Sequence, residues 1–164
     1  MKAIEILKKL KQEEQRKKYP SVPEYALGTP KYSDKTANGL TKCIVEFLIL
    51  SGWQAERINT MGRMIDNRQQ VTDVLGRTKT IGSTKYIPTT GTKGSADISA
   101  TIKGKSVKIE VKIGKDRQSE DQKRYQEMIE RAGGIYWIAK TFDDFYKNYQ
   151  KLILIDLINE GENI

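Results

Sequence analysis

The sequence has no histidine and a single cysteine, Cys43, among its 164 residues. Without histidine, the chain lacks the usual general base of neutral pH and the usual zinc ligand. One cysteine can form neither an internal disulfide nor a cysteine-rich metal site. Any catalysis must therefore use carboxylates, lysine and hard cations.

Long apolar runs are also lacking. No stretch resembles the ~20 consecutive apolar residues of a membrane-spanning helix, and charges occur throughout the first twenty residues, unlike in a secretory signal. Both absences favour an intracellular protein without a membrane partner.

Positive charge is in excess. The chain has 29 Lys and Arg against 21 Asp and Glu, a formal net charge of +8. This excess favours a polyanionic partner such as nucleic acid. The length suits one ordinary domain with a hydrophobic core.

The first 36 residues predict a helix followed by an extended arm. Residues 3–18 have a charged helical pattern with a narrow apolar stripe, and we expect this helix to be peripheral. The stripe consists of Ile4, Leu7 and Leu10. Residues 20–38 contain three of the four prolines and little periodicity, which is typical of an arm or linker. We expect the compact domain to span 37–150 and to leave 151–164 as a tail of unassigned structure.

The domain is predicted to be α/β, with a mixed central sheet flanked by helices. A long segment, 61–93, is rich in Thr, Gly, Arg and Lys, and a short hairpin is predicted around 72–82. Segments of this length without a clear pattern are usually functional or mobile. The patterned elements are a helix over 37–52, a strand over 53–60, two strands within 94–113, a helix over 119–132, a strand over 135–141 and a helix near 142–149.

Residues 94–113 alternate apolar and polar side chains along two strands joined at the turn "KGK". The period of two places Asp97, Glu110 and Lys112 on the face opposite the apolar residues. A two-residue turn through "KG" sets Asp97 opposite Glu110, whereas a turn through "GK" sets it opposite Lys112. Opposite Cβ atoms lie about 5 Å apart and diagonal ones roughly 7 Å apart. In either register the two carboxylates can therefore reach a shared point.

Two ionised carboxylates this close repel each other unless a cation lies between them or one is protonated. Oxygen ligands favour magnesium or manganese over zinc. A water acidified by the metal can attack a phosphodiester, and Lys112 could orient it or stabilise the developing charge. The hairpin is thus a candidate metal-dependent phosphodiesterase centre. By spacing alone, however, a solvated sheet face without chemistry is the better interpretation.

The stretch "GSADI…IEVK…DRQSEDQ" resembles the core of the PD-(D/E)xK nuclease superfamily, in particular its virus-type replication-repair nuclease (VRR-NUC) branch in small phage proteins. The resemblance covers roughly residues 37–145. It implies a restriction-endonuclease-like core with the order α-β-β-β-α-β. It also implies a DNA endonuclease that depends on Mg²⁺ or Mn²⁺, in the host cytoplasm if the chain is phage-encoded.

The resemblance also implies roles for individual residues. Asp97 and Glu110 match the metal ligands and Lys112 the catalytic lysine, and the backbone carbonyl of Val111 would be a further ligand. Gln122 matches a glutamine near the start of the following helix. Its spacing from Ser119 equally suits a helix capping box, and both roles can hold.

Some relatives take an additional acid from the first helix of the core. Glu46, inside the apolar run "CIVEFLIL", is the candidate here. A lone carboxylate is costly to bury unless it is paired or aimed at a metal. The alternative is a narrow exposed stripe on the helix.

Candidate DNA contacts occur in two places. Arg57, Asn59 and Arg63 match the family's first strand and the loop after it, although an ordinary solvated edge is an alternative. The segment 61–93 is longer than the family's minimal core and suits a basic DNA-binding flap. Its cations are Arg63, Arg68, Arg77, Lys79, Lys85 and Lys93, against only Asp66 and Asp73.

The resemblance suggests structure-specific cutting, at junctions or flaps, in phage replication, recombination or repair. A less selective nuclease and a non-catalytic nucleic-acid-binding protein with the same fold are the alternatives. Both a monomer and a homodimer fit the sequence. A set of aromatic residues is expected to pack in the core rather than to stack on bases, namely Tyr136, Trp137, Phe142, Phe145 and Tyr146.

Overall fold

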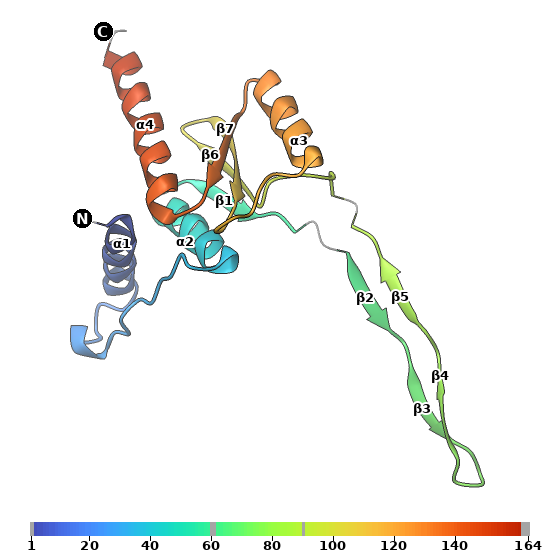
Figure 1. Cartoon of the computed structure of the whole chain (residues 1–164). Helices are drawn as coiled ribbons and strands as arrows, with labels where there is room; N and C mark the ends of the chain where they lie inside the picture. Colours follow the sequence, from blue (N-terminus) through green and yellow to red (C-terminus); the bar gives the residue numbers. More distant parts are fainter. Residues whose placement is uncertain (1, 60–61, 90, 162–164) are drawn as a thin grey trace.

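The computed structural model describes residues 2–59, 62–89 and 91–161 (Figure 1). It contains a mixed four-stranded sheet flanked by helices, which confirms the predicted α/β class. The strand order is β1-β6-β7-β8, in which β1, β6 and β7 are antiparallel and β7 and β8 are parallel. The strands are β1 (Gln54–Arg57), β6 (Ile98–Ile102), β7 (Lys105–Val111) and β8 (Ile135–Ala139).

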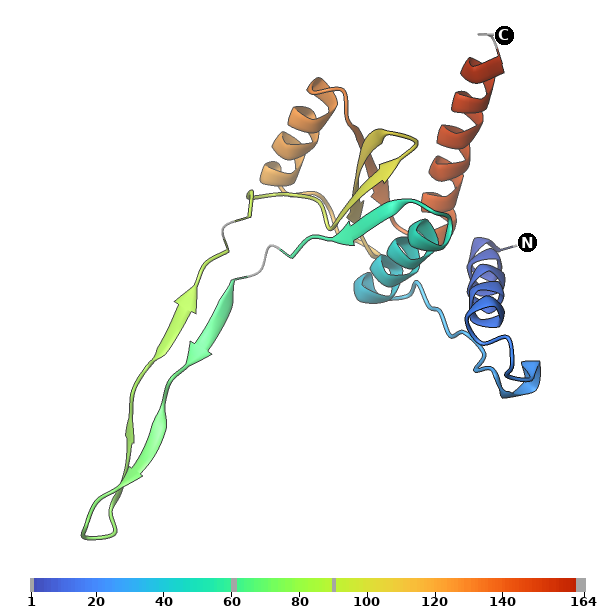
Figure 2. The same cartoon turned by 180° about the vertical axis from the view of Figure 1, so that it is seen from behind.

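Helices cover both faces of this sheet (Figures 1 and 2). Helix α2 (Ala37–Leu50) and helix α4 (Phe142–Gly161) pack on the face that carries the alternating apolar side chains of β6 and β7. Helix α3 (Glu120–Arg131) connects β7 to β8, as a parallel pair requires, and covers the opposite face. The prediction that one face of the hairpin is apolar and packs in the core is therefore confirmed. Its polar face, however, is covered by a helix.

Helix α2 forms the centre of the core. Thr36 caps its start by accepting a hydrogen bond from the Gly39 N–H (3.1 Å), and Gly52 follows its end with φ +85°, a conformation that favours glycine. The ring of Phe47 makes edge contacts with four aromatic rings of α4. Trp137 of β8 and the aromatic residues of α4 pack in or against the core, as predicted, whereas Tyr136 lies on the opposite face of the sheet, against Tyr125 of α3.

Helix α1 (Ala3–Lys18) also belongs to this core, so the prediction of a peripheral helix is wrong. Leu7 is 0% exposed and packs between α2 and α4, and the Ala3 N–H donates a 2.8 Å hydrogen bond to Asp143 at the start of α4. The narrow apolar stripe of α1 thus packs against two helices at once.

One further segment agrees with its prediction, and another adds structure that was not predicted. Between α1 and α2, the only regular structure among residues 19–36 is a short 3-10 helix, Glu24–Ala26, as expected of an arm. At the other end, α4 continues through position 150 to Gly161. The unassigned tail therefore begins as a continuation of the last helix.

Residues 62–89, in the segment between β1 and β6, form a two-stranded ribbon that projects from the body in both views (Figures 1 and 2). The predicted hairpin around 72–82 is confirmed, and the ribbon extends well beyond it. Its base is the pair β2 (Arg63–Asp66) and β5 (Thr84–Ile87), and its outer part is the pair β3 (Gln69–Thr72) and β4 (Thr78–Ile81). We call residues 62–89 the arm.

Of the helices in the described part of the chain, none has the length and apolar character required to cross a membrane.

Replacing Leu7 with alanine should lower the free energy of unfolding by about 2–5 kcal/mol, because it leaves a cavity between three helices. Lys9→Ala, on the exposed face of the same helix, should change it by less than about 0.5 kcal/mol. Urea denaturation monitored by circular dichroism measures both values. Equal stabilities of the two variants would mean that α1 is peripheral after all.

Candidate active site

The turn of the central hairpin determines which residues face each other. Lys103 (φ 47°) and Gly104 (φ 75°) both adopt the left-handed conformation, as the two central residues of a type I′ turn do. Ile98 consequently pairs with Ile109, so that Asp97 lies opposite Glu110. Of the two predicted registers, the structure has the first.

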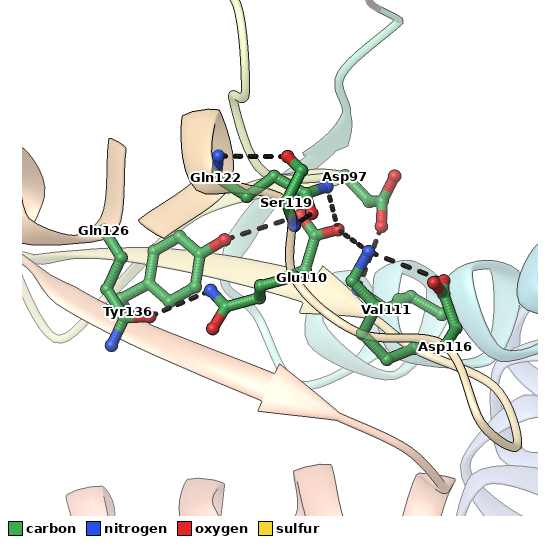
Figure 3. A network of polar contacts seen from close by, with 10 residues as sticks. Asp97, Glu110, Val111, Asp116, Ser119, Gln122, Gln126 and Tyr136 are labelled. Atoms are coloured by element: carbon green, nitrogen blue, oxygen red, sulfur yellow. Dashed lines mark hydrogen bonds and ion pairs between the residues drawn. The ribbon is translucent and has the colours of Figure 1, made fainter. Parts of the chain in front are cut away.

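Glu110 is only 2% exposed, although its side chain is a carboxylate. Polar groups from three elements surround it (Figure 3). Its Oε1 contacts the Lys112 ammonium at 3.0 Å and accepts a 2.5 Å hydrogen bond from the Gln122 amide, and its Oε2 lies 3.4 Å from the Tyr136 hydroxyl. These contacts supply the pairing without which a buried charge is very costly.

The side-chain amide of Gln122 contacts two partners, one at the start of its own helix and one at the site. Its oxygen accepts a hydrogen bond from the Ser119 N–H (2.9 Å), and the Ser119 hydroxyl accepts one from the Gln122 N–H (3.3 Å). This is a complete capping box at the start of α3. The nitrogen of the same amide donates to Glu110. The cap thus fixes the amide that holds the buried carboxylate.

Asp97 lies directly before β6, at the edge of the same site. Its Oδ2 accepts a 2.9 Å hydrogen bond from the Val111 N–H, and its backbone carbonyl accepts one from the Ile58 N–H (2.7 Å). In an extended strand the N–H and C=O of one residue point to the same side. The Val111 carbonyl therefore faces the side on which Asp97 lies.

The electrostatics reflect a tight cluster of opposite charges. Burial, together with the negative charge of Asp97, raises the pKa of the Glu110 carboxyl above its ordinary value. Burial alone would lower the pKa of the Lys112 ammonium, but Glu110 and Asp116 raise it above the ordinary value. Burial and the charge of Glu110 raise the pKa of the Tyr136 hydroxyl, which stays protonated at neutral pH. Lys112 is thus a fixed cation at the site.

The donor set fits a hard divalent cation. Two carboxylates, Asp97 and Glu110, and the backbone carbonyl of Val111 come together where β6 begins and β7 ends, and all of these donors are oxygen atoms. Among the described residues, no three carboxylate or thiol groups lie close enough to hold a metal by themselves. Water or substrate oxygens would therefore complete the coordination of an ion, as is usual for magnesium.

Glu46 lies elsewhere. Its carboxylate pairs with the Lys11 ammonium of α1 at 3.0 Å and is close enough to Tyr32 to raise the pKa of that hydroxyl, after burial, the larger cause. The structure therefore places Glu46 in a contact between α1, α2 and the segment that connects these two helices, and not in a cluster with Asp97 and Glu110. Its half-buried position on α2 corresponds to the alternative of a narrow, partly exposed stripe.

The expected DNA contacts lie at the end of β1, next to the start of α3 and along the arm. Arg57 and Asn59 are exposed at and after the end of β1, and Arg57 donates a 2.8 Å hydrogen bond to Asn38. Lys93 pairs with Asp121 at the start of α3 (2.9 Å). The other three predicted contacts, Arg63, Lys79 and Lys85, are exposed along the arm.

Three residues of the site were not predicted. Tyr136 was assigned to the core, but its hydroxyl reaches Glu110, and Asp116 contacts Lys112 at 3.4 Å. Gly94 has φ +77°, and a Cβ at this position would collide with the Asp121 carbonyl group. The signal for Gly94 was its place in "GSADI". Asp116 had the same kind of signal, because it begins the stretch "DRQSEDQ". Tyr136 gave no signal, because sequence spacing does not show where a parallel neighbour strand will lie.

No protein-family model matches the chain, and no curated protein or solved structure matches it significantly.

Replacing Lys112 with methionine should destabilise the protein by about 3 kcal/mol at pH 8, because Glu110 would be left buried without its cation. The pKa of Glu110 is already raised, and it would rise further. A raised carboxyl pKa favours folding at low pH, and this contribution is lost as the pH rises through the folded-state value. The deficit should therefore shrink towards pH 5, as measured by urea denaturation across this range.

The matched control is Lys108→Met. Lys108 lies on the same face of β7, but its ammonium contacts the Ser99 hydroxyl rather than a carboxylate. We expect a small loss that does not depend on pH. A Lys112→Met deficit of equal size at pH 5 and pH 8 would contradict the ionic account of the site.

Proposed function

We propose that the chain is a divalent-metal-dependent DNA endonuclease with a restriction-endonuclease-like core of the PD-(D/E)xK type. The observation that carries the proposal is the convergence of Asp97, Glu110 and Lys112 where the central strands β6 and β7 begin and end, with both Glu110 and Lys112 buried. A solvated sheet face would leave these side chains exposed and separately hydrated. The order α2–β1–β6–β7–α3–β8 also supports such a core.

Each residue has a defined part in this proposal. Asp97, Glu110 and the Val111 carbonyl would hold Mg²⁺ or Mn²⁺, which when bound would acidify a water and neutralise charge on the scissile phosphate. Lys112 presents a fixed ammonium to the phosphoryl oxygens, where negative charge develops in the transition state. Gln122 and Tyr136 orient the Glu110 carboxylate.

The substrate is proposed to be branched DNA, such as a junction or a flap, in phage replication, recombination or repair. The arm projects from beside the candidate active site. It therefore offers a second surface, which could bind a DNA branch that a linear duplex does not have. A homodimer is part of the proposal only for four-way junctions, because two coordinated cuts require two active sites. A nuclease of low structural selectivity remains the second candidate, favoured by the net charge of +8, which attracts any DNA.

Asp97→Ala should lower DNA cleavage by more than about 10²-fold, the loss that even outer partners of a metal can cause. DNA binding should be retained, because the substitution also removes a negative charge near phosphate. Cleavage of labelled linear, flapped and four-way DNA, with Mg²⁺ and with a chelator, measures the effect.

The control is Glu127→Ala, which removes an exposed carboxylate from the same side of the sheet, on α3. It should cut as the wild type does, and thermal melting should show both variants folded. Cleavage that survives Asp97→Ala would remove Asp97 from the site. Wild-type protein that binds DNA but never cuts it would favour the non-catalytic alternative.

Replacing Lys79 and Lys85 together with alanine should weaken DNA binding and reduce the slope of log K against log salt. Each phosphate contact contributes about 0.9 to this slope, so the loss should be about 1.8. Fluorescence anisotropy at several salt concentrations measures it. Lys9→Ala with Lys17→Ala removes the same charge from α1 and should leave the slope nearly unchanged. An unchanged slope in the arm variant would mean that the arm does not contact DNA.

A further inference from the structure

The arm emerges directly beside the candidate active site. Its two ends continue β1 and precede β6, which are paired up to Arg57 and Ile98. The next residue towards the arm, Ile58, donates its N–H to the carbonyl of Asp97 (2.7 Å). A molecule bound at the base of the arm therefore lies next to the ends of β6 and β7, where the two carboxylates are.

The arm stands clear of the described helices and of the four-stranded sheet along most of its length (Figure 1). Every residue from Gln69 to Tyr86 is exposed, and these residues include side chains on both faces of the ribbon. An isolated two-stranded ribbon is at best marginally stable in water. Such an element is typical of a surface that is completed by a partner.

Charge identifies the kind of partner. Both acidic residues of the arm are neutralised within it, since Asp66 binds Arg68 (2.7 Å) and Asp73 binds Arg77 (3.0 Å). Within the described part of the chain, the other cations of the arm form no ion pair. These are Arg63, Lys79 and Lys85. The exposed ribbon is therefore cationic along its length and complementary to a phosphate backbone.

The outer part of the ribbon also carries side chains of the kind that contact bases in a DNA groove. The cross-strand pairs place Gln70 and Thr72 on one face with Thr80 and Thr78. Hydroxyl and amide groups of this kind contact phosphates and base edges. A two-stranded ribbon fits the major groove of B-DNA. At about 3.3 Å per residue, the ribbon from its base to its tip spans roughly 40 Å, about one helical turn.

The tip carries two adjacent apolar side chains. Val74 is fully exposed and Leu75 is 72% exposed, in turn positions that usually hold polar residues or glycine. They are held in a preformed loop, because the Asp73 carboxylate accepts the N–H groups of Leu75 and Arg77, both at 2.9 Å. Gly76 supplies the left-handed residue that closes the turn (φ 75°). The turn thus holds the apolar side chains of Val74 and Leu75 in a fixed, solvent-exposed position, which we call the wedge.

We propose that this tip, Val74 and Leu75, inserts between unstacked bases at the branch point of a DNA substrate while the ribbon follows the backbone. Apolar side chains that enter base steps are a known means of opening or kinking DNA, and unstacking costs least where pairing is already interrupted. The tip therefore selects branched over continuous duplex DNA. The inference rests on the proposed function for its partner, DNA, but not on cleavage.

The test uses the full chain with Asp97→Ala, so that no DNA is cut. Val74→Ser with Leu75→Ser is compared with the unsubstituted tip on a flap and on a linear duplex of equal length, each with 2-aminopurine at the position of the branch. The tip variant should bind the flap about 10-fold more weakly, as expected for the loss of contacts to bases. It should bind the duplex within about twofold, and it should lose the rise in 2-aminopurine fluorescence that accompanies unstacking.

The matched control is Val71→Thr with Ile81→Thr, which removes exposed apolar groups from the shaft of the arm and keeps β-forming residues. It should preserve both the preference for the flap and the fluorescence rise. Thermal melting should be the same for all variants, because the tip is far from the core.

The outcomes separate the inference from the proposed function. If the unsubstituted protein binds neither DNA, the proposed function fails and the inference fails with it. If it binds both and the tip variant keeps the same flap-to-duplex ratio, only the wedge is overturned. If the tip variant instead changes the solution mass in light scattering, the tip contacts a second copy of the chain, which also overturns the wedge.

Discussion

The burial of one carboxylate, Glu110, is the constraint on which the site depends. A charge removed from water must be paired and hydrogen-bonded, and the partners of Glu110 come from three different elements. Lys112 follows the same strand, Gln122 begins α3, and Tyr136 lies on β8. The position of α3 on the sheet and the geometry of the candidate active site are therefore set by the same contacts.

The arrangement of the arm follows from the topology of the sheet. Since β1 and β6 are antiparallel neighbours, the chain leaves and re-enters the body at adjacent points. A ribbon of any length can be inserted there without displacing the core. In the proposed function, the body would hold the reactive groups, and the arm would present its cations and apolar tip to DNA. In the proposed function, chemistry and substrate choice are thus assigned to separate parts of one small chain.

Much of the fold could be predicted from local patterns. The alternation in 94–113 identified both strands and their faces, and the capping spacing of Ser119 and Gln122 placed the start of α3. The position of α1 and the covering of the hairpin's polar face could not be predicted, because local sequence patterns do not contain this information. The width of the stripe around Leu7 did not show that two helices would enclose it. The polar face of the hairpin was indistinguishable from a solvated one, because periodicity does not show which helix will cover it.

The sequence alone determined the types of donor available, the pairing of Asp97 with Glu110 within two registers, and the excess of positive charge. These depend only on composition and on the period of a strand. Tertiary structure decided that the turn selects the first register, that Glu46 pairs with Lys11 away from the site, and that Tyr136 reaches Glu110. Such contacts join residues distant along the chain, and they exist only once the helices have packed on the sheet.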